Sequence, residues 1–177
     1  MSVAPGLRIG QGIDVHRFSS DPDRPLVLGG VTIDAEDATG LDGHSDADVV
    51  GHAIADALLG AAGLGDLGRH FPDTDPKWAG ADSMTLLSWV VELVGEAGWV
   101  PVNADCTVVA ERPKLAPYVA VMADRVGGVL GAPVSVKATR AEGLGALGRA
   151  EGVACTAVVL VSGLIERDGE PTGGVGP

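Results

Sequence analysis

The sequence has few cysteines, few aromatic residues and few basic residues. Cys106 and Cys155 lie far apart among 177 residues and lack C-x-x-C spacing, so we expect buried free thiols rather than disulfides or a cysteine-based metal site. Lys and Arg number 12 against 24 Asp and Glu, which gives a formal net charge of -12. This charge argues against nucleic acid as a partner. It would also repel a phosphorylated metabolite, so such a substrate would need metal ions, helix N-termini or local cations to hold it.

The chain also lacks long apolar runs. No stretch approaches the length of a membrane span, and Met1–Leu7 has no charged region before an apolar stretch, so we expect a cytoplasmic protein with no membrane partner. A length of 177 residues suits a single domain, 1–177, with a core of its own. Within it we expect an ordered catalytic part at about 8–163 and a disordered tail at 164–177, where Gly, Pro and charged residues dominate.

Hydrophobic periodicity predicts a mixture of strands and helices. The predicted strands are 8–15, a hairpin over 26–33 that turns at its glycine pair, 102–110, 134–139 and 153–162. A first helix is predicted from Asp46 to Ala62, with Ser45 as N-cap and Asp48 in a capping-box position. A second should run from Asp82 or Ser83 to Ala97, and a third from Pro117 to Val126 with a stop at Gly127–Gly128. This pattern predicts an α+β fold, an α/β sandwich in which a mixed β-sheet carries about three helices on one face.

Three of the four histidines fall in two short segments, 14–16 and 43–52, in a pattern that suits a metal ion. Asp14 and His16 alternate along a predicted strand and therefore share a face, and His52 could complete the set from a helix. One carboxylate and two imidazoles without cysteine favour an open divalent site for zinc, cobalt or manganese. The competing interpretation is a surface strand whose histidine is satisfied by ordinary hydrogen bonds.

The first predicted helix carries a polar stripe opposite its apolar face. Asp48, His52 and Asp56 follow one another at intervals of four residues, so they share one side of the helix. Most such stripes are solvated faces. The histidine favours instead a metal ligand flanked by carboxylates that could orient imidazoles.

Three further segments are rich in groups that bind polar ligands. The segment 65–76 is loop-like and dense in carboxylates, whereas 110–116 and 137–145 each leave a predicted strand. Cations, hydroxyls and free backbone amides gather at those strand ends, which is an arrangement that binds phosphates.

Six ordered blocks, which span Arg8 to about Val161, together resemble one enzyme family. They are G-x-G-x-D-V-H, G-H-S-D-x-D-x-x-x-H, A-D-A-L-L-G-A-A, G-D-x-G-x-x-F-P-D-T-D-P, a strand followed by A-x-x-P-K, and K-A-T-x-x-E-x-L-G. The sequence is similar in these blocks to the 2-C-methyl-D-erythritol 2,4-cyclodiphosphate synthase family. That resemblance implies a homotrimer with active sites between subunits, which converts 4-diphosphocytidyl-2-C-methyl-D-erythritol 2-phosphate to the cyclic diphosphate and CMP in the non-mevalonate isoprenoid pathway.

The resemblance also implies roles for particular residues. Asp14, His16 and His52 would hold a zinc-type ion, and Glu142 would help to hold a second divalent ion, magnesium or manganese, on the substrate diphosphate. His44 and Ser45 would contact the reacting phosphates, with His44 as a catalytic residue. The segments matching the family's erythritol site are Asp66, Leu67 and Gly68 together with Phe71, Pro72, Asp73, Thr74 and Asp75. The cytidine nucleotide would lie against Ala110, Glu111, Arg112, Pro113, Lys114, Leu115 and Ala116, with Ala138 and Thr139 near its phosphates.

The chain departs from the family pattern after Thr139. Arg140 stands where the family has a threonine assigned to the transition state, and we expect Arg140 to take over as a catalytic residue. Ala146 replaces a phenylalanine that lines a cavity on the trimer axis, so that cavity would be wider here. Arg149 retains the family arginine near it and is expected to contact substrate or ligand; an ordinary surface arginine is the competing interpretation.

Two other functions would use the same residues. A metal-dependent phosphohydrolase could employ Asp and His ligands to activate water. A trimeric scaffold could bind a metal or nucleotide without turnover. The products formed from the diphosphocytidyl substrate would distinguish the three.

Overall fold

The structure, a computed structural model, describes residues 6–164. Along this part of the chain the elements are β1 (Leu7–Arg17), β2 (Val27–Leu28), β3 (Val31–Thr32), α1 (Val49–Ala62), α2 (Leu67–His70), the 3-10 helix η1 (Pro76–Trp78), α3 (Ser83–Glu96), β4 (Trp99–Val109), α4 (Val119–Leu130), β5 (Val134–Thr139), α5 (Gly145–Gly148) and β6 (Gly152–Gly163). The predicted tail lies outside the described residues except for Leu164.

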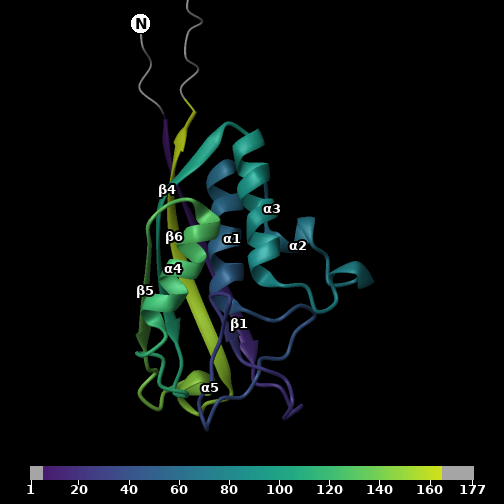
Figure 1. Cartoon of the computed structure of the whole chain (residues 1–177), viewed down its shortest axis with the longest axis vertical. Coiled ribbons are helices and arrows are strands. Elements are labelled where there is room, and N and C mark those ends of the chain that lie inside the picture. Colours follow the sequence, from purple (N-terminus) through teal and green to yellow (C-terminus); the bar gives the residue numbers. More distant parts are fainter. Residues whose placement is uncertain (1–5, 165–177) are drawn as a thin grey trace, which may run out of the picture.

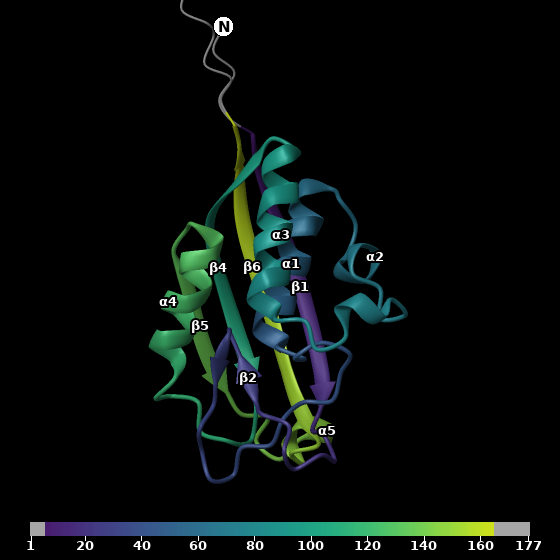
Figure 2. The same cartoon turned by 45° about the vertical axis from the view of Figure 1, so that its right-hand side comes forward.

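The main sheet has four strands in the order β1-β6-β4-β5. β6 pairs antiparallel with both β1 and β4, whereas β4 and β5 are parallel, and α4 forms the crossover between them. Helices α1, α3 and α4 cover one face of this sheet, and β2 and β3 form a separate hairpin (Figures 1 and 2). The predicted mixed sheet with about three helices is therefore confirmed, as is the hairpin at the glycine pair.

The boundaries of two helices differ from the prediction. α1 begins at Val49, three residues later than expected, and its N-cap is Asp48 rather than Ser45. α4 begins at Val119 and continues through Gly127–Gly128 to Leu130, ending at Gly131 with φ 69°. Each glycine inside a helix costs about 1 kcal/mol relative to alanine. Burial of Val126 and Leu130 on either side of the pair offsets that cost.

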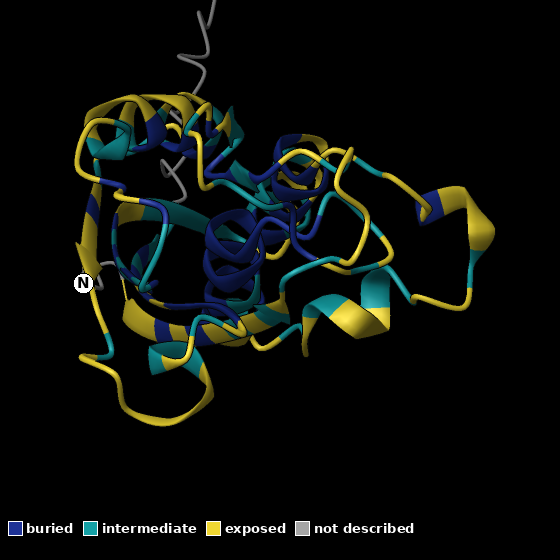
Figure 3. Cartoon of the chain, turned by 90° about the horizontal axis from the view of Figure 1, so that it is seen from below, coloured by how far each residue is buried: buried dark blue, intermediate teal, exposed yellow. Residues whose placement is uncertain are grey.

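Helix α1 lies unusually close to strand β1 because two strand residues lack side chains. A Cβ on Gly10 would stand 1.8 Å from the carbonyl oxygen of Ala57, and one on Gly12 would stand 2.1 Å from that of Ala53. The helix is buried on nearly every side and occupies the centre of the molecule (Figure 3). Strand alternation then places Asp14, two residues beyond Gly12, on the same face of β1, toward α1.

The opposite face of the sheet carries exposed apolar side chains. Alternation along β1 places them on the side away from α1, and Val158 of β6 lies opposite Gln11 on that side. The exposed apolar residues of this outer sheet face are Leu7, Ile9, Ile13, Val15 and Val158. No helix within residues 6–164 combines the length and apolar character that crossing a membrane requires.

Both cysteines are free and buried, as predicted. Cys106 on β4 and Cys155 on β6 belong to the core between sheet and helices. The neighbouring Cys106 thiol and burial raise the pKa of Cys155 far above its ordinary value. The cysteines therefore serve packing rather than chemistry.

Candidate metal and substrate site

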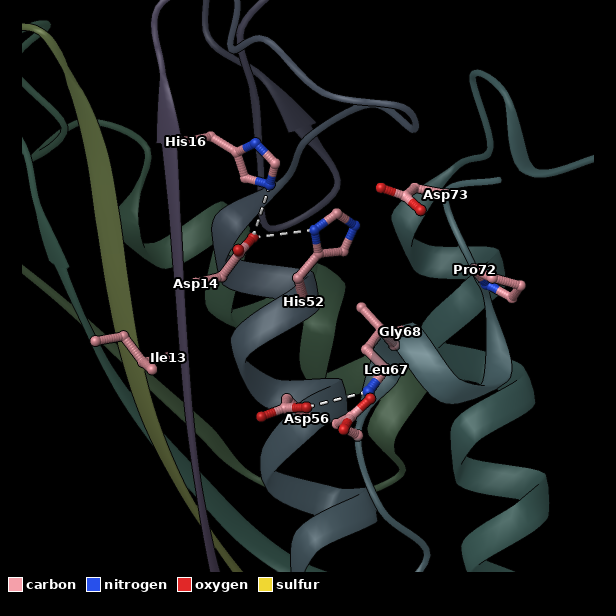
Figure 4. A pocket seen from close by; sticks show the side chains of 10 residues that line it. Ile13, Asp14, His16, His52, Asp56, Leu67, Gly68, Pro72 and Asp73 are labelled. Atoms are coloured by element: carbon pink, nitrogen blue, oxygen red, sulfur yellow. Dashed lines mark hydrogen bonds and ion pairs between the residues drawn. The ribbon is translucent and has the colours of Figure 1, made fainter. Parts of the chain in front are cut away.

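Asp14, His16 and His52 converge at the end of β1 and the first turns of α1. Each offers a ligand atom, and these atoms all lie within 4.8 Å of one another. Oδ2 of Asp14 is 3.3 Å from Nε2 of His16 and 3.0 Å from Nδ1 of His52, and Figure 4 shows both rings turned toward the carboxylate. The structure thus forms the cluster that the sequence predicted.

The outer nitrogens of both imidazoles have their own partners. Nδ1 of His16 lies 2.7 Å from the carbonyl oxygen of Asp42; since that oxygen can only accept, Nδ1 donates to it, and Nε2, which faces Asp14, can bind a cation once it has lost its proton. Nε2 of His52 lies 3.2 Å from Oγ of Ser45, which leaves Nδ1 facing Asp14. Such outer contacts fix the ring orientation of metal-binding histidines.

The cluster is electrostatically prepared for a cation. Burial is the largest single influence and would raise the pKa of Asp14, but hydrogen bonds and charge attraction from His16 and His52 together outweigh it and hold that pKa well below its usual range. The hydrogen bond to Asp14 in turn raises the pKa of His16. The carboxylate is therefore ionised, the state in which it can bind a metal ion.

Asp48 lies at the junction behind this cluster and is fully buried, so the polar stripe predicted on α1 is not a solvated face. Burial raises the pKa of Asp48, and backbone N–H groups oppose that effect. Its carboxylate accepts hydrogen bonds from the backbone N–H groups of Gly29, Gly30, Val50 and Gly51 and from the hydroxyl of Ser83. Asp48 thereby ties the β2–β3 hairpin and the N-terminus of α3 to the start of α1, four residues before His52.

A cavity of about 550 Å³ opens beside the three ligands. It also includes part of the segment between α1 and α3, and Asp56 of α1 accepts a hydrogen bond from the backbone N–H of Leu67 (3.1 Å), which fastens that segment to the helix (Figure 4). The cavity is lined by Ile13, Asp14, His16, His52, Asp56, Asp66, Leu67, Gly68, Pro72 and Asp73. Five residues predicted to bind substrate thus lie at the predicted metal cluster.

Other residues predicted for this site lie around the cavity without lining it. Ser45 contacts His52, as described above, and Nε2 of His44 lies 3.1 Å from the carbonyl oxygen of Asp75. Phe71 turns toward aromatic side chains of η1 and α3. Thr74 is not among the lining residues.

A second cavity of about 440 Å³ lies at the ends of β4 and β5. It is lined by Asp37, Ala110, Glu111, Pro113, Lys114, Leu115, Ala116, Ala138, Thr139 and Arg140. Arg112 is the predicted nucleotide residue of this run that does not line it; its guanidinium donates to the carbonyl of Asp37 (2.9 Å) and lies over the ring of Phe18. The segment predicted to hold cytidine therefore forms one concave surface, which shares no lining residue with the first cavity.

Arg140 and Glu142 meet at the rim of this second cavity. Nη2 of Arg140 donates to Oε2 of Glu142 at 3.1 Å, and its Nε is 4.0 Å from Oε2 of Glu111. Glu142 is well exposed and lies outside the Asp14 cluster within the described residues. Arg149 is paired with Glu151 (2.6 Å) and lines neither cavity.

Two residues of the site had no sequence signal that pointed to them. Arg24 donates hydrogen bonds to the carbonyls of Gly43 and Ser45, on either side of His44. Asp37 joins the second cavity from a loop far away in the sequence. Neither residue belongs to a motif, and both depend on long-range contacts that periodicity does not reveal.

The fold and the Asp14–His16–His52 cluster beside a cavity are those of a metal-dependent enzyme, and comparison with known proteins agrees with that class. Residues 7–162 match the model of the YgbB family, and the chain belongs to that family. Among curated relatives, the 2-C-methyl-D-erythritol 2,4-cyclodiphosphate synthase of Symbiobacterium thermophilum is 60% identical over 160 residues, which cover 89% of this chain and 99% of the relative. The synthase of Synechococcus sp. is 54% identical over 92% of this chain and 99% of its own.

Solved structures show the same fold. A 2C-methyl-D-erythritol-2,4-cyclodiphosphate synthase in a CDP-bound form is 38% identical, with a TM-score of 0.77 over 87% of this chain and 99% of its own. A CDP complex of IspF from Plasmodium falciparum is 31% identical, with a TM-score of 0.76 over 90% of this chain and 97% of its own. The bifunctional IspDF of Campylobacter jejuni matches with a TM-score of 0.85 and 41% identity over 92% of this chain, which covers 44% of that longer protein.

Proposed function

We propose that this protein acts as a 2-C-methyl-D-erythritol 2,4-cyclodiphosphate synthase, a phosphorus-oxygen lyase of isoprenoid biosynthesis. It converts 4-diphosphocytidyl-2-C-methyl-D-erythritol 2-phosphate to the cyclic diphosphate and CMP. The observation that carries this proposal is the convergence of Asp14, His16 and His52 on the wall of a cavity, in a chain of this family. The sequence match over nearly the whole length of the synthases supports it.

The donor set fits a zinc ion. One ionised carboxylate and two imidazoles whose outer nitrogens are already engaged would hold it and leave a coordination position open toward the cavity. Bound there, zinc would neutralise phosphate charge and act as a Lewis acid. We assign Glu142 to a second divalent ion, magnesium or manganese, because this exposed carboxylate, which pairs with Arg140, would be a single protein ligand and would leave most of that ion's coordination to substrate phosphates.

The chain's own residues bind and orient the substrate. Asp66 and Asp73 present carboxylates to the first cavity, where they would accept hydrogen bonds from the hydroxyls of the erythritol part. We assign His44 and Ser45 to the reacting phosphates: Ser45 contacts His52 of the ligand cluster, and His44 precedes Ser45 in the chain. Holding both phosphates in this way lowers the entropic cost of ring closure. The reaction therefore needs no covalent nucleophile from the protein.

The nucleotide belongs in the second cavity. Its apolar wall of Ala110, Pro113 and Leu115 suits a pyrimidine face, and Thr139 and Arg140 supply donors for the phosphates. The relatives solved with CDP support a cytidine ligand. Arg140 would stabilise charge in the transition state, since a guanidinium donates parallel hydrogen bonds to phosphate oxygens.

We further propose a homotrimer whose active sites lie between subunits. The two cavities share no lining residue within one chain, so a single substrate would reach both if a neighbouring subunit supplied one of them. The outer sheet face offers apolar surface for such an assembly. Arg149 would then act near the trimer axis beside Ala146. Light scattering after gel filtration measures the assembly directly, and a monomer at micromolar concentration would contradict it.

A product assay tests the reaction. The purified protein is incubated with 4-diphosphocytidyl-2-C-methyl-D-erythritol 2-phosphate, zinc and magnesium, and products are followed by phosphorus NMR. The synthase gives cyclic diphosphate and CMP in equal amounts, and His52→Ala serves as the inactive control. Release of inorganic phosphate would instead identify a phosphohydrolase, and ligand binding without product would identify a scaffold.

A further inference from the structure

The segment that carries most of the predicted substrate residues has few anchors of its own. Between α1 and α3 it contains the four-residue helix α2, which buries none of its residues, and the three-residue helix η1, which buries Trp78. In Figures 1 and 2 this segment projects from the helical layer beside α3. It nevertheless supplies Asp66, Pro72 and Asp73 to the first cavity. Something outside the segment must therefore fix its position.

Three aromatic rings connect the segment to α3. The ring centroids of Phe71 and Trp78 are 4.8 Å apart at an interplanar angle of 84°, and those of Trp78 and Trp89 are 5.2 Å apart at 85°. Phe71 and Trp89 are separated by 6.2 Å. Edge-to-face geometry at these distances is favourable. We call Phe71, Trp78 and Trp89 the aromatic cluster.

Ring contacts rather than hydrogen bonds hold the side chain of Trp78. The side chain is 8% exposed, yet among the described residues its indole N–H meets no hydrogen-bond acceptor. The ammonium group of Lys77 lies over the same ring at 4.4 Å. Trp89, by contrast, belongs to the 14-residue helix α3, and the next residue in that helix, Val90, is fully buried. Trp89 therefore offers a fixed surface against which Phe71 and Trp78 can pack.

The same segment also contacts His44. The carbonyl oxygen of Asp75 contacts Nε2 of His44, and the backbone N–H of Gly80 donates to the carbonyl oxygen of His44 at 2.8 Å. Asp75 and Gly80 flank Trp78 on either side along the chain. A shift of Trp78 would therefore displace Asp73 and both contacts of His44 with this segment, one made by its ring and one by its carbonyl oxygen.

We propose that Trp89 is a positioning residue that holds the segment 66–78 against α3 and thereby sets the affinity for the methylerythritol half of the substrate. Trp89 lines neither the first nor the second cavity and acts through Phe71 and Trp78. This inference rests on the proposed function for the identity of the ligand. The packing of the segment on Trp89 can be measured without it.

The kinetic test compares Trp89→Ala with Trp89→Phe. Loss of two ring contacts in Trp89→Ala should raise KM for the diphosphocytidyl substrate about tenfold, whereas kcat should change less and CMP affinity should stay the same because the second cavity does not involve the cluster. Trp89→Phe keeps an aromatic ring and should recover most of the KM effect. Trp99→Ala is the matched control, since Trp99 is also partly exposed but packs under Arg8, away from the segment.

Hydrogen exchange provides the readout that does not depend on turnover. Amides of residues 66–78 should exchange faster in Trp89→Ala than in the parent protein, and those of α1 should not. An unchanged KM together with unchanged exchange would overturn the inference while leaving the synthase reaction intact. Equal rises of KM in Trp89→Ala and Trp99→Ala would also overturn it, since both would then report general destabilisation. If the parent protein forms no cyclic diphosphate, the proposed function fails, and the exchange comparison alone decides whether Trp89 holds the segment.

Discussion

Replacing Asp48 by asparagine should destabilise the protein, although the two side chains have nearly the same shape and size. Oδ1 of Asp48 accepts from Gly29, Val50 and Gly51, whereas Oδ2 accepts from Gly30 at 2.7 Å and from the Ser83 hydroxyl at 2.8 Å. In Asp48→Asn an NH2 group takes the place of Oδ2. It can donate to the Ser83 hydroxyl, because a hydroxyl can also accept, but it cannot accept from the backbone N–H of Gly30, which would then face another donor.

The magnitude follows from these contacts. A buried donor left without a partner costs about 1–3 kcal/mol, and loss of the negative charge weakens the remaining hydrogen bonds by about 1 kcal/mol in sum. We expect Asp48→Asn to lower the free energy of unfolding by roughly 2–4 kcal/mol. With an m-value of about 2 kcal/mol/M, the urea midpoint would fall by about 1–2 M.

Urea unfolding followed by circular dichroism at a fixed subunit concentration measures this loss. Asp82→Asn is the matched control: Asp82 caps α3 from an exposed position, accepting from the backbone N–H of Thr85 at 2.8 Å, and asparagine caps helices equally well. The control should change stability by less than about 0.5 kcal/mol. An equally small effect of Asp48→Asn would refute the reasoning, since it would mean that the Gly30 N–H finds another partner.

Four further predictions concern the site. His52→Ala should remove at least one metal equivalent and most activity while circular dichroism stays unchanged; full metal content with near-normal turnover would contradict the assignment. After gel filtration the ion at the histidine cluster should remain bound, whereas the ion assigned to Glu142 should be lost and be required in the assay buffer, so equal retention of both would count against two distinct sites. Arg140→Ala should lower turnover by about 10²-fold to 10³-fold at saturating substrate and metal, with partial recovery in Arg140→Thr, and a loss within about threefold would favour an arginine that points to solvent. Arg24→Leu should lower kcat/KM by about 10-fold to 100-fold by releasing the carbonyls on either side of His44, with Arg24→Lys intermediate, and unchanged kinetics would show that the loop holds itself.

The metal cluster could be predicted because it depends on local regularities. Alternation along β1 puts Asp14 and His16 on one face wherever that strand lies, and the position of His52 on α1 follows from helical periodicity. The segment 110–116 was predicted from the resemblance, and all of its residues except Arg112 line the second cavity because they follow one another along the chain; a cytidine ligand there remains a prediction. The single-domain division and the cytoplasmic location remain predictions.

The helix boundaries could not be predicted, because residues far away in the sequence decide them. Ser45 and Asp48 are equally good N-caps by type; contacts from Gly29 and Gly30 select Asp48. The same holds for the aromatic cluster, since the periodicity of α3 gave no reason to pair Trp89 with a loop. Propensity describes neighbours along the chain, whereas these choices are made by neighbours in space.

Gly10 and Gly12 of β1 limit how far this site can be grafted onto another protein. Gly10 and Gly12 let α1 touch the backbone of the strand, and this contact sets how far His52 stands from Asp14. Grafting the three ligands onto another strand–helix pair would reproduce their chemistry but not their spacing, since any Cβ at the glycine positions would push the helix outward. The spacing of the three ligand side chains is in this sense encoded in two residues that carry no ligand atom, and Gly12→Ala would change that spacing before any ligand residue was altered.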